Sequence, residues 1–295
     1  MPKPLFPHPS LELIPLSGPP PGTPDCQMNL VLVHGIDGDH LTTWTSQSEE
    51  KPWYETIISA APTLSVSTVD IPYSHRKWLS GSEEYLEQLS VQLLKKLMEG
   101  HILDRPTMFL CHSLGGILLK RVVTDALSSA KGTTLARRRA NWRKIAFIGV
   151  PHNGSPWAKT WFAKLLILMR SETSRDLKPG NRFLVAVDKG FEQSITQYQL
   201  CSVHSFHETQ PIWQDKKVWL IGPVLRRITR FYGPIVPQQF SKLWNVTTSD
   251  HQIQACHFEV SKLDLPHSGA ILDLVRVFCA ECSSKNTEQA YLFCD

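Results

Sequence analysis

A serine stands at a sharp break between two apolar segments, in the residues Phe109–Ile117 (FLCHSLGGI). The run before Ser113 is typical of a buried strand, and the residues after it have helical spacing. A strand, a tight turn and a helix hold a serine hydroxyl above a sheet, where a base can reach it and backbone N–H groups lie beside it. Such a turn needs small residues two positions before and after the serine; Gly115 meets this need, and Cys111 stands where glycine is usual. We therefore predict that Ser113 is a nucleophile, with His112 and Gly115 shaping its turn.

An activated serine needs a base and a carboxylate that orients the base. In doubly wound hydrolases these residues follow the chain order serine, acid, histidine, each on a loop after a strand. Glu208 follows an apolar run at residues 200–206, and His251 follows another at residues 243–249. Both should emerge with Ser113 at the carboxyl edge of the sheet. The order predicts a catalytic triad of Ser113, His251 and Glu208.

Other histidines compete for the role of base. His257 and His267 also come late in the chain. His267, within LPHSGA, is typical of a turn that leads into a helix. His251 is preferred because a predicted strand delivers it directly to the sheet edge.

Other carboxylates compete for the role of acid. Asp215 lies in the charged stretch QDKK, which is typical of a solvated loop. Asp250 is adjacent to the predicted base, so in an extended backbone its side chain should point away from the imidazole. Glu208 is preferred, and the two aspartates stay open as alternatives.

The oxyanion that forms during acyl transfer needs backbone N–H donors. One is expected from Leu114, directly after the nucleophile, and the other from Ile36, in the loop after a strand predicted at Leu30–His34. Gly35 and Gly38 would let this loop turn close to the substrate. The histidine that ends the strand is expected to shape the loop, because it precedes the turn.

Alternating apolar and helical patterns describe the elements that position these residues. The predicted strands cover residues 30–34, 64–70, 107–111, 144–150, 200–206 and 243–249, and the predicted helices cover residues 82–101, 114–130 and 268–282. Strands that alternate with helices predict an α/β fold with a mostly parallel, doubly wound sheet and helices on both faces.

The alternation of predicted strands and helices stops at about residues 155–199. We interpret this segment as a cap insertion. Its apolar residues Trp157, Trp161, Leu165 and Leu168 share one helical stripe. Three interpretations compete: a core helix, a mobile cap, or a helix that rests on a membrane surface. A cap that is partly core is preferred, and at about fourteen residues the stripe is too short to span a bilayer.

Composition places the chain among intracellular globular proteins. Its 295 residues, 42% of them hydrophobic, can bury the core of one large domain at residues 30–295. The net charge of +4 is mild, and no nucleic-acid motif accompanies it. The seven scattered cysteines are typical of reduced core residues. Residues 1–29 are rich in proline and are expected to be poorly ordered. We predict no signal peptide in this segment and no transmembrane span in the chain.

The chain resembles the serine-active-site-containing family of α/β-hydrolases, the lipase-like serine esterases. Five stretches carry the resemblance between about Leu30 and Phe258: LVLVHGIDGDHLTTW, FLCHSLGGILLKRVV, FIGVPHNGSPWA, VHSFHET and DHQIQACHF. The chain departs from the family pattern at Cys111, at Val150 (usually threonine), and in the segment between His251 and Cys256, which is one residue longer.

The resemblance implies an α/β-hydrolase fold and hydrolysis of a carboxylic ester, with lipid or phospholipid acyl esters as substrates. No metal or organic cofactor is implied. Relatives associated with mitochondrial or endoplasmic reticulum membranes imply peripheral membrane contact of an otherwise cytoplasmic protein. Two alternatives stay open: a catalytically weak protein of the same fold that binds lipid or acts as a scaffold, and an acyltransferase.

Overall fold

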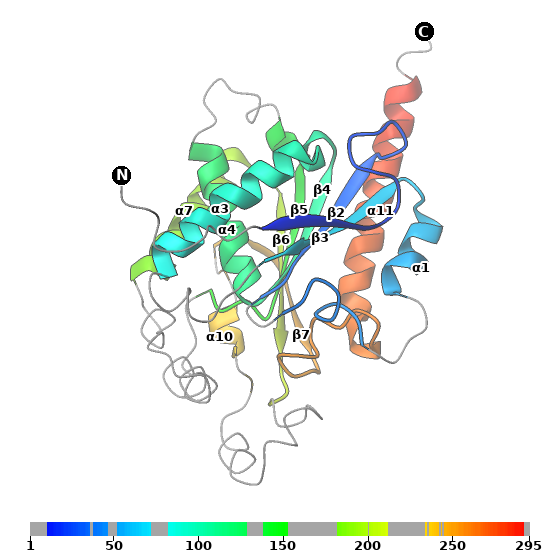
Figure 1. Ribbon diagram of the computed structural model, residues 1–295. Helices are drawn as coiled ribbons and strands as arrows, with labels where there is room; N and C mark the ends of the chain where they lie inside the picture. The colour runs from blue at the N-terminus through cyan, green and yellow to red at the C-terminus, as the bar shows by residue number, and fades with distance from the viewer. Residues whose placement is uncertain are drawn as a thin grey trace.

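A seven-stranded sheet forms the centre of the molecule (Figure 1). The computed structural model describes residues 11–35, 38–46, 52–71, 82–128, 138–152, 182–199, 201–211, 234, 236–241, 243 and 245–291. The strand order is β1-β3-β2-β4-β5-β6-β7, with β1 antiparallel to β3 and the other pairs parallel. The strands are β1 Glu12–Ser17, β2 Met28–Val33, β3 Leu64–Asp70, β4 Thr107–His112, β5 Trp142–Ile148, β6 Ser202–Glu208 and β7 Thr247–Ile253.

Helices cover both faces of the sheet, so the prediction of a doubly wound α/β fold is confirmed. Helices α3, α4 and α7 lie on one face, and α1 and α11 lie on the other (Figure 1). The α-helices are α1 Trp53–Ala60, α3 Ser82–Glu99, α4 Leu114–Ser128, α7 Arg182–Tyr198, α10 Gln238–Ser241 and α11 Gly269–Tyr291. Short 3-10 turns occur at Ile102–Asp104, Arg139–Asn141 and Pro266–Ser268.

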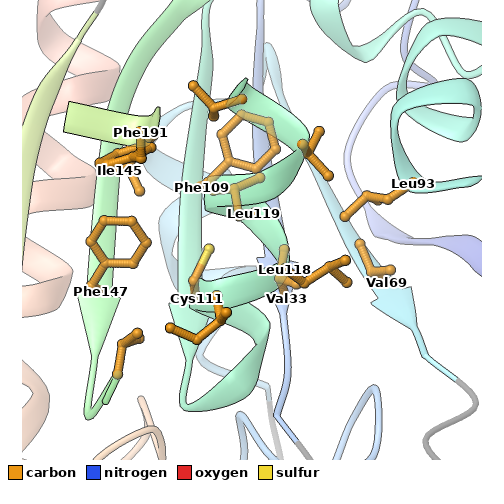
Figure 2. Packing of buried hydrophobic residues seen from close by; sticks show 14 of the residues in the cluster. Val33, Val69, Leu93, Phe109, Cys111, Leu118, Leu119, Ile145, Phe147 and Phe191 are labelled. Atoms are coloured by element: carbon orange, nitrogen blue, oxygen red, sulfur yellow. The ribbon is translucent and has the colours of Figure 1, made fainter. Parts of the chain in front are cut away.

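The central strands are apolar on both faces because each face is covered by a helical layer. Every residue of β2 and β4 is buried. On the α4 face, strand residues such as Phe109 and Phe147 pack with Leu118 and Leu119 of α4 and with Phe191 of α7 (Figure 2). Helical layers thus cover both faces of the sheet, and Ser113 and Glu208 lie at its carboxyl edge.

Cys111 points away from that edge and into this core, where it is fully buried (Figure 2). A small apolar side chain is favoured there, because the thiol packs among hydrocarbon groups and burial raises its pKa well above the ordinary value. The departure from the usual elbow glycine is therefore accommodated by the fold.

The N-terminal segment differs from its prediction. Residues 1–10 lie outside the described residues, but β1 pairs along the edge of β3, and Leu11 is buried in the core. The expectation of a poorly ordered segment over residues 1–29 is therefore wrong for residues 11–29. Proline in this segment is compatible with an edge strand, because Pro15 lacks only an N–H donor.

The predicted cap falls largely outside the described residues, including its stripe of Trp157, Trp161, Leu165 and Leu168. Its last part forms α7, which packs on α4 through Leu184, Val187 and Phe191. That part is a core helix of the sheet layer. Within the described ranges, no helix offers an apolar stretch of the length that a bilayer requires.

Candidate active site

Ser113 occupies the turn between β4 and α4 with a left-handed backbone, at φ +51°. A left-handed conformation is unfavourable for a side chain other than glycine, and such strain is typical of functional turns. The turn is fixed by two backbone hydrogen bonds: the Ser113 N–H donates to the Ile148 carbonyl at 3.0 Å, and the Gly116 N–H donates to the Ser113 carbonyl at 3.1 Å. The predicted strand, turn and helix therefore form around this serine.

Two glycines are required by the close approach of the chain after β2. A Cβ on Gly115 would lie 2.4 Å from the carbonyl oxygens of both Val33 and His34. A Cβ on Gly35 would lie 2.7 Å from the Cβ of Ser113. Both distances are shorter than real carbon contacts, so the loop after β2 and the elbow can meet only because both positions are glycine.

His257 is the histidine that faces the nucleophile. Its Nε2 lies 3.1 Å from the Ser113 Oγ, and its Nδ1 lies 3.1 Å from the Glu208 Oε1. A carboxylate only accepts hydrogen bonds, so Nδ1 carries the hydrogen and the lone pair of Nε2 faces the serine hydroxyl. This is the hydrogen-bonding order of a serine nucleophile, a base and an orienting acid.

Glu208 ends β6 and is buried, at 1% exposure. The same oxygen, Oε1, also accepts the backbone N–H of Val236 at 2.7 Å, so a main-chain donor and the His257 ring together fix the carboxylate. Gly149, with φ +56°, lies against the pair: a Cβ there would meet the Glu208 Oε2 at 2.8 Å and the His257 Cε1 at 3.2 Å. No pattern had marked this glycine as a site residue, although its place near the end of the strand predicted at residues 144–150 was a usable signal.

The structure does not place His251 at the site. Its ring stacks on Phe206, with centroids 4.9 Å apart, and its Nε2 lies 2.9 Å from the Ser249 Oγ. The assignment failed because β7 runs four residues further than predicted, to Ile253, so His251 lies within the strand. The loop after β7 delivers His257 instead, as the chain-order rule requires.

The competing residues lie elsewhere or outside the described part. Asp250 lies 3.2 Å from the Nδ1 of His207 and accepts a hydrogen bond from Gln238 at 2.9 Å. His267 donates from Nε2 to the carbonyl of Glu259 at 2.8 Å. Asp215 is not among the described residues.

His34 fixes the loop that follows β2. The ring is fully buried, its Nδ1 lies 2.8 Å from the Gly35 carbonyl, and its Nε2 lies 3.2 Å from the Ile71 backbone nitrogen. Since a carbonyl accepts and an N–H donates, Nδ1 carries the hydrogen and Nε2 accepts. Burial lowers the pKa of His34, which favours this neutral form. The Gly38 N–H donates to the same Gly35 carbonyl at 3.1 Å.

The predicted oxyanion donors are only partly described. Leu114 is the first residue of α4, so its N–H lies at the positive end of a helix dipole beside Ser113. A Cβ on Gly35 would lie 3.3 Å from the Leu114 nitrogen, which brings the loop after β2 next to this donor. Ile36 lies outside the described residues.

The loop after β2 is also bonded to the loop that carries His257. The Ser46 Oγ donates to the Asp264 Oδ2 at 2.7 Å, and the Ser261 Oγ donates to the Thr43 carbonyl at 2.9 Å. The Leu263 N–H donates to the Trp44 carbonyl at 2.9 Å. The two loops that flank Ser113 are therefore held in one arrangement.

Comparison with known proteins gives relatives in sequence and in structure. Protein SERAC1 of Homo sapiens is 28% identical over 236 residues, which cover 73% of this chain and 35% of the relative. Protein SERAC1 of Danio rerio is 26% identical over 230 residues, which cover 69% of this chain and 33% of the relative. The chain thus spans about a third of the length of these curated relatives. No protein-family model matches the chain.

Among solved structures, the mature form of the Bacillus licheniformis lipase BlEst2 superimposes with a TM-score of 0.56 at 14% identity, covering 92% of this chain and 98% of the lipase. Its propeptide form gives a TM-score of 0.50 at 16% identity and covers 87% of this chain and 51% of that one. Together with the sheet topology, these neighbours show that the chain has the α/β-hydrolase fold.

Proposed function

We propose that this α/β-hydrolase-fold protein is a serine hydrolase that cleaves carboxylic esters, with acyl esters of lipids as its substrates. The observation that carries the proposal is the pair of 3.1 Å contacts that joins Ser113, His257 and Glu208 in a buried site. The ester and lipid class is supported by the structural neighbour from Bacillus licheniformis, which is a lipase. Contact with a membrane surface and the cellular location stay predictions.

In the proposed reaction, the Ser113 oxygen attacks the ester carbonyl carbon while its proton passes to the His257 Nε2. Glu208 accepts the Nδ1–H and stabilises the positive charge that forms on the ring. The Leu114 N–H donates to the oxyanion of the tetrahedral intermediate. His257 then returns the proton to the leaving alcohol, and an acyl-enzyme on Ser113 remains.

Deacylation repeats these steps with water. His257 takes a proton from a water molecule, the resulting hydroxide attacks the acyl carbon, and the acid leaves as Ser113 regains its proton. An alcohol in place of this water would give acyl transfer through the same intermediate. Product analysis in the presence of a competing alcohol separates the two reactions.

The proposal is tested by fluorophosphonate labelling, since this probe reacts with an activated serine. The purified protein is compared with the variants Ser113→Ala, His257→Ala and His251→Ala, and mass spectrometry locates the adduct. We expect one adduct, on Ser113, in the wild type and in His251→Ala, and no adduct in the other two. His251→Ala is the matched control, because His251 lies in the edge strand β7, where its ring contacts Phe206 and Ser249.

The orienting acid is tested with Glu208→Gln and a series of p-nitrophenyl esters of increasing acyl length. Loss of the carboxylate should lower kcat by about 10⁴-fold.

Two outcomes of the labelling experiment would count against the proposal. Labelling that survives in His257→Ala but is lost in His251→Ala would contradict the triad. A folded wild-type protein that does not label would contradict the hydrolase proposal and favour the binding or scaffold alternative.

A further inference from the structure

A second contact joins the elbow to the loop that carries His257, and it is made by the residue just before the nucleophile. His112 ends β4, and its ring is buried. Its Nε2 lies 3.0 Å from the backbone carbonyl oxygen of His257. Because a carbonyl only accepts, Nε2 must carry the hydrogen and donate it. The two rings lie 4.9 Å apart between centroids, at 41° to each other.

This contact completes the support of His257. Glu208 binds the ring at Nδ1 and Ser113 faces it at Nε2, but both contacts act on the side chain. The bond from His112 acts on the main chain of the same residue. Since His112 and Ser113 are adjacent, any shift of the His257 backbone relative to His112 changes the distance between the Ser113 Oγ and the base.

The protonation state of His112 suits this role. Burial lowers the pKa of His112 well below its ordinary value, and the charge of His257 acts in the same direction. A neutral His112 keeps one N–H for the carbonyl. It also adds no like charge beside the imidazolium that forms on His257 when the base takes the proton from the serine.

We propose that His112 is a positioning residue of the base: its Nε2–H holds the His257 carbonyl and thereby sets the imidazole between Ser113 and Glu208. This inference rests on the proposed function, since it assigns His112 a part in that reaction. This role is more than the shaping of the turn around Ser113. Shaping the turn needs only a residue that fits between Cys111 and Ser113, whereas holding the His257 carbonyl needs a hydrogen-bond donor.

The test compares His112→Phe, which keeps the ring volume and removes the donor, with His112→Gln, whose amide can still donate an N–H. His251→Gln is the matched control, on the edge strand β7, three strands away from β4 in the sheet. We expect His112→Phe to lower kcat and the fluorophosphonate labelling rate by up to about 10²-fold, the size of effect that a small misplacement of a reacting group produces. KM should change little, and His112→Gln should recover most of the loss. Equal rates in wild type and His112→Phe, or equal losses in both His112 variants, would overturn the proposal.

A second measurement does not depend on catalysis. In protein labelled with ¹⁵N-histidine, NMR should show a neutral Nε2–H tautomer whose signals disappear in His112→Gln. An Nδ1–H tautomer at this position would overturn the proposal even if His112→Phe failed to fold. A wild type that neither labels nor hydrolyses esters overturns the proposed function itself, and the positioning role with it. Normal wild-type labelling with an unaffected His112→Phe overturns the role of His112 alone.

Discussion

At the scale of single residues, the proposed acid and base, Glu208 and His257, pack against a residue that has no side chain. Gly149 has φ +56°, and its N–H donates to the Phe206 carbonyl at 2.8 Å, so its Cα stays pressed against the acid and the base. The Glu208 Oε2 and the His257 ring occupy the space that a Cβ would need. The geometry of the acid and base therefore depends on a glycine that takes no part in the chemistry.

We predict that Gly149→Ala lowers both stability and activity. A left-handed backbone should cost about 1–2 kcal/mol for alanine, and the added methyl should displace Glu208 or His257 enough to lower kcat by about 10²-fold. Urea unfolding and ester hydrolysis measure the two effects. Gly269→Ala is the control: a Cβ there meets nothing within 4 Å, so it should leave activity unchanged and raise stability by about 0.4–1 kcal/mol. Equal activity in both variants would contradict this account.

The placement of single residues could be predicted where a local pattern was present. Ser113 lies in a turn whose small residues are visible in the sequence, and Glu208 ends a strand that is apolar enough to recognise. His257 was passed over because β7 is an edge strand, largely half-exposed, and its polar sequence TTSDHQI hides its true end. The contact between His112 and the His257 carbonyl joins residues 145 positions apart in the chain, so no local sequence pattern predicts it.

At the scale of elements, a buried ion pair joins the helix after the nucleophile to its neighbour. The Lys120 Nζ in α4 binds the Asp188 Oδ1 in α7, and the lysine is fully buried. Burial is the largest effect on both groups: it lowers the pKa of Lys120 and raises the pKa of Asp188, against their mutual attraction. The pair therefore fixes how α7 lies on α4, and removing one partner leaves a charge in the core.

We predict that Asp188→Asn lowers the free energy of unfolding by about 3–5 kcal/mol, because the Lys120 charge is left unpaired. Asp273→Asn is the control, since Asp273 and Arg276 form an exposed pair whose loss should cost about 0–1 kcal/mol. Urea unfolding measures both variants. The double variant Lys120→Met/Asp188→Leu should be more stable than Asp188→Asn alone; if it were less stable, charge compensation would not be the role of the pair.

Most elements were predictable from apolar periodicity, and β3 was predicted with its observed bounds. Helices α1 and α7 were not predicted. Among the strands, the exceptions share a physical cause, since β1 and β7 are the two edges of the sheet. An edge strand is stabilised by one neighbour and by contacts distant in sequence, so its own residues need not be apolar. The segment around β1 was therefore predicted to be poorly ordered, because its proline-rich composition was the only signal that its sequence offered.

At the scale of the whole molecule, several buried histidines make the fold sensitive to acid. Burial lowers the pKa values of His34, His112 and His152, and it lowers the pKa of His204 to about 4. Below a pH of about 6.5 the unfolded chain takes up protons at these residues while the folded chain does not. Protons bound preferentially by the unfolded state lower the free energy of unfolding, so stability should fall as the pH drops from about 6.5 toward the folded-state pKa values.

We predict that His152→Phe reduces this loss. His152 is fully buried, packs edge-on against Phe147, and has no hydrogen-bond partner for either ring nitrogen in the part of the chain that the structure describes. Phenylalanine has a similar shape and no titration, so the variant should lose about 2 kcal/mol less than the wild type between pH 7 and pH 5. Urea unfolding at pH 8, 7 and 5 measures this difference, and the variant and wild type should change alike between pH 8 and 7. Parallel curves down to pH 5 would show that His152 is not part of the acid response.

The wide separation of the site residues along the chain has a consequence for biosynthesis. Ser113 and the loop after β2 are synthesised early, but Glu208 comes only at the end of β6, and the histidine that faces the serine comes 144 positions after it. A growing chain on the ribosome therefore carries the nucleophile long before the groups that activate it. Under the proposed function, reactivity should therefore appear only when β7 and the loop after it have joined the sheet.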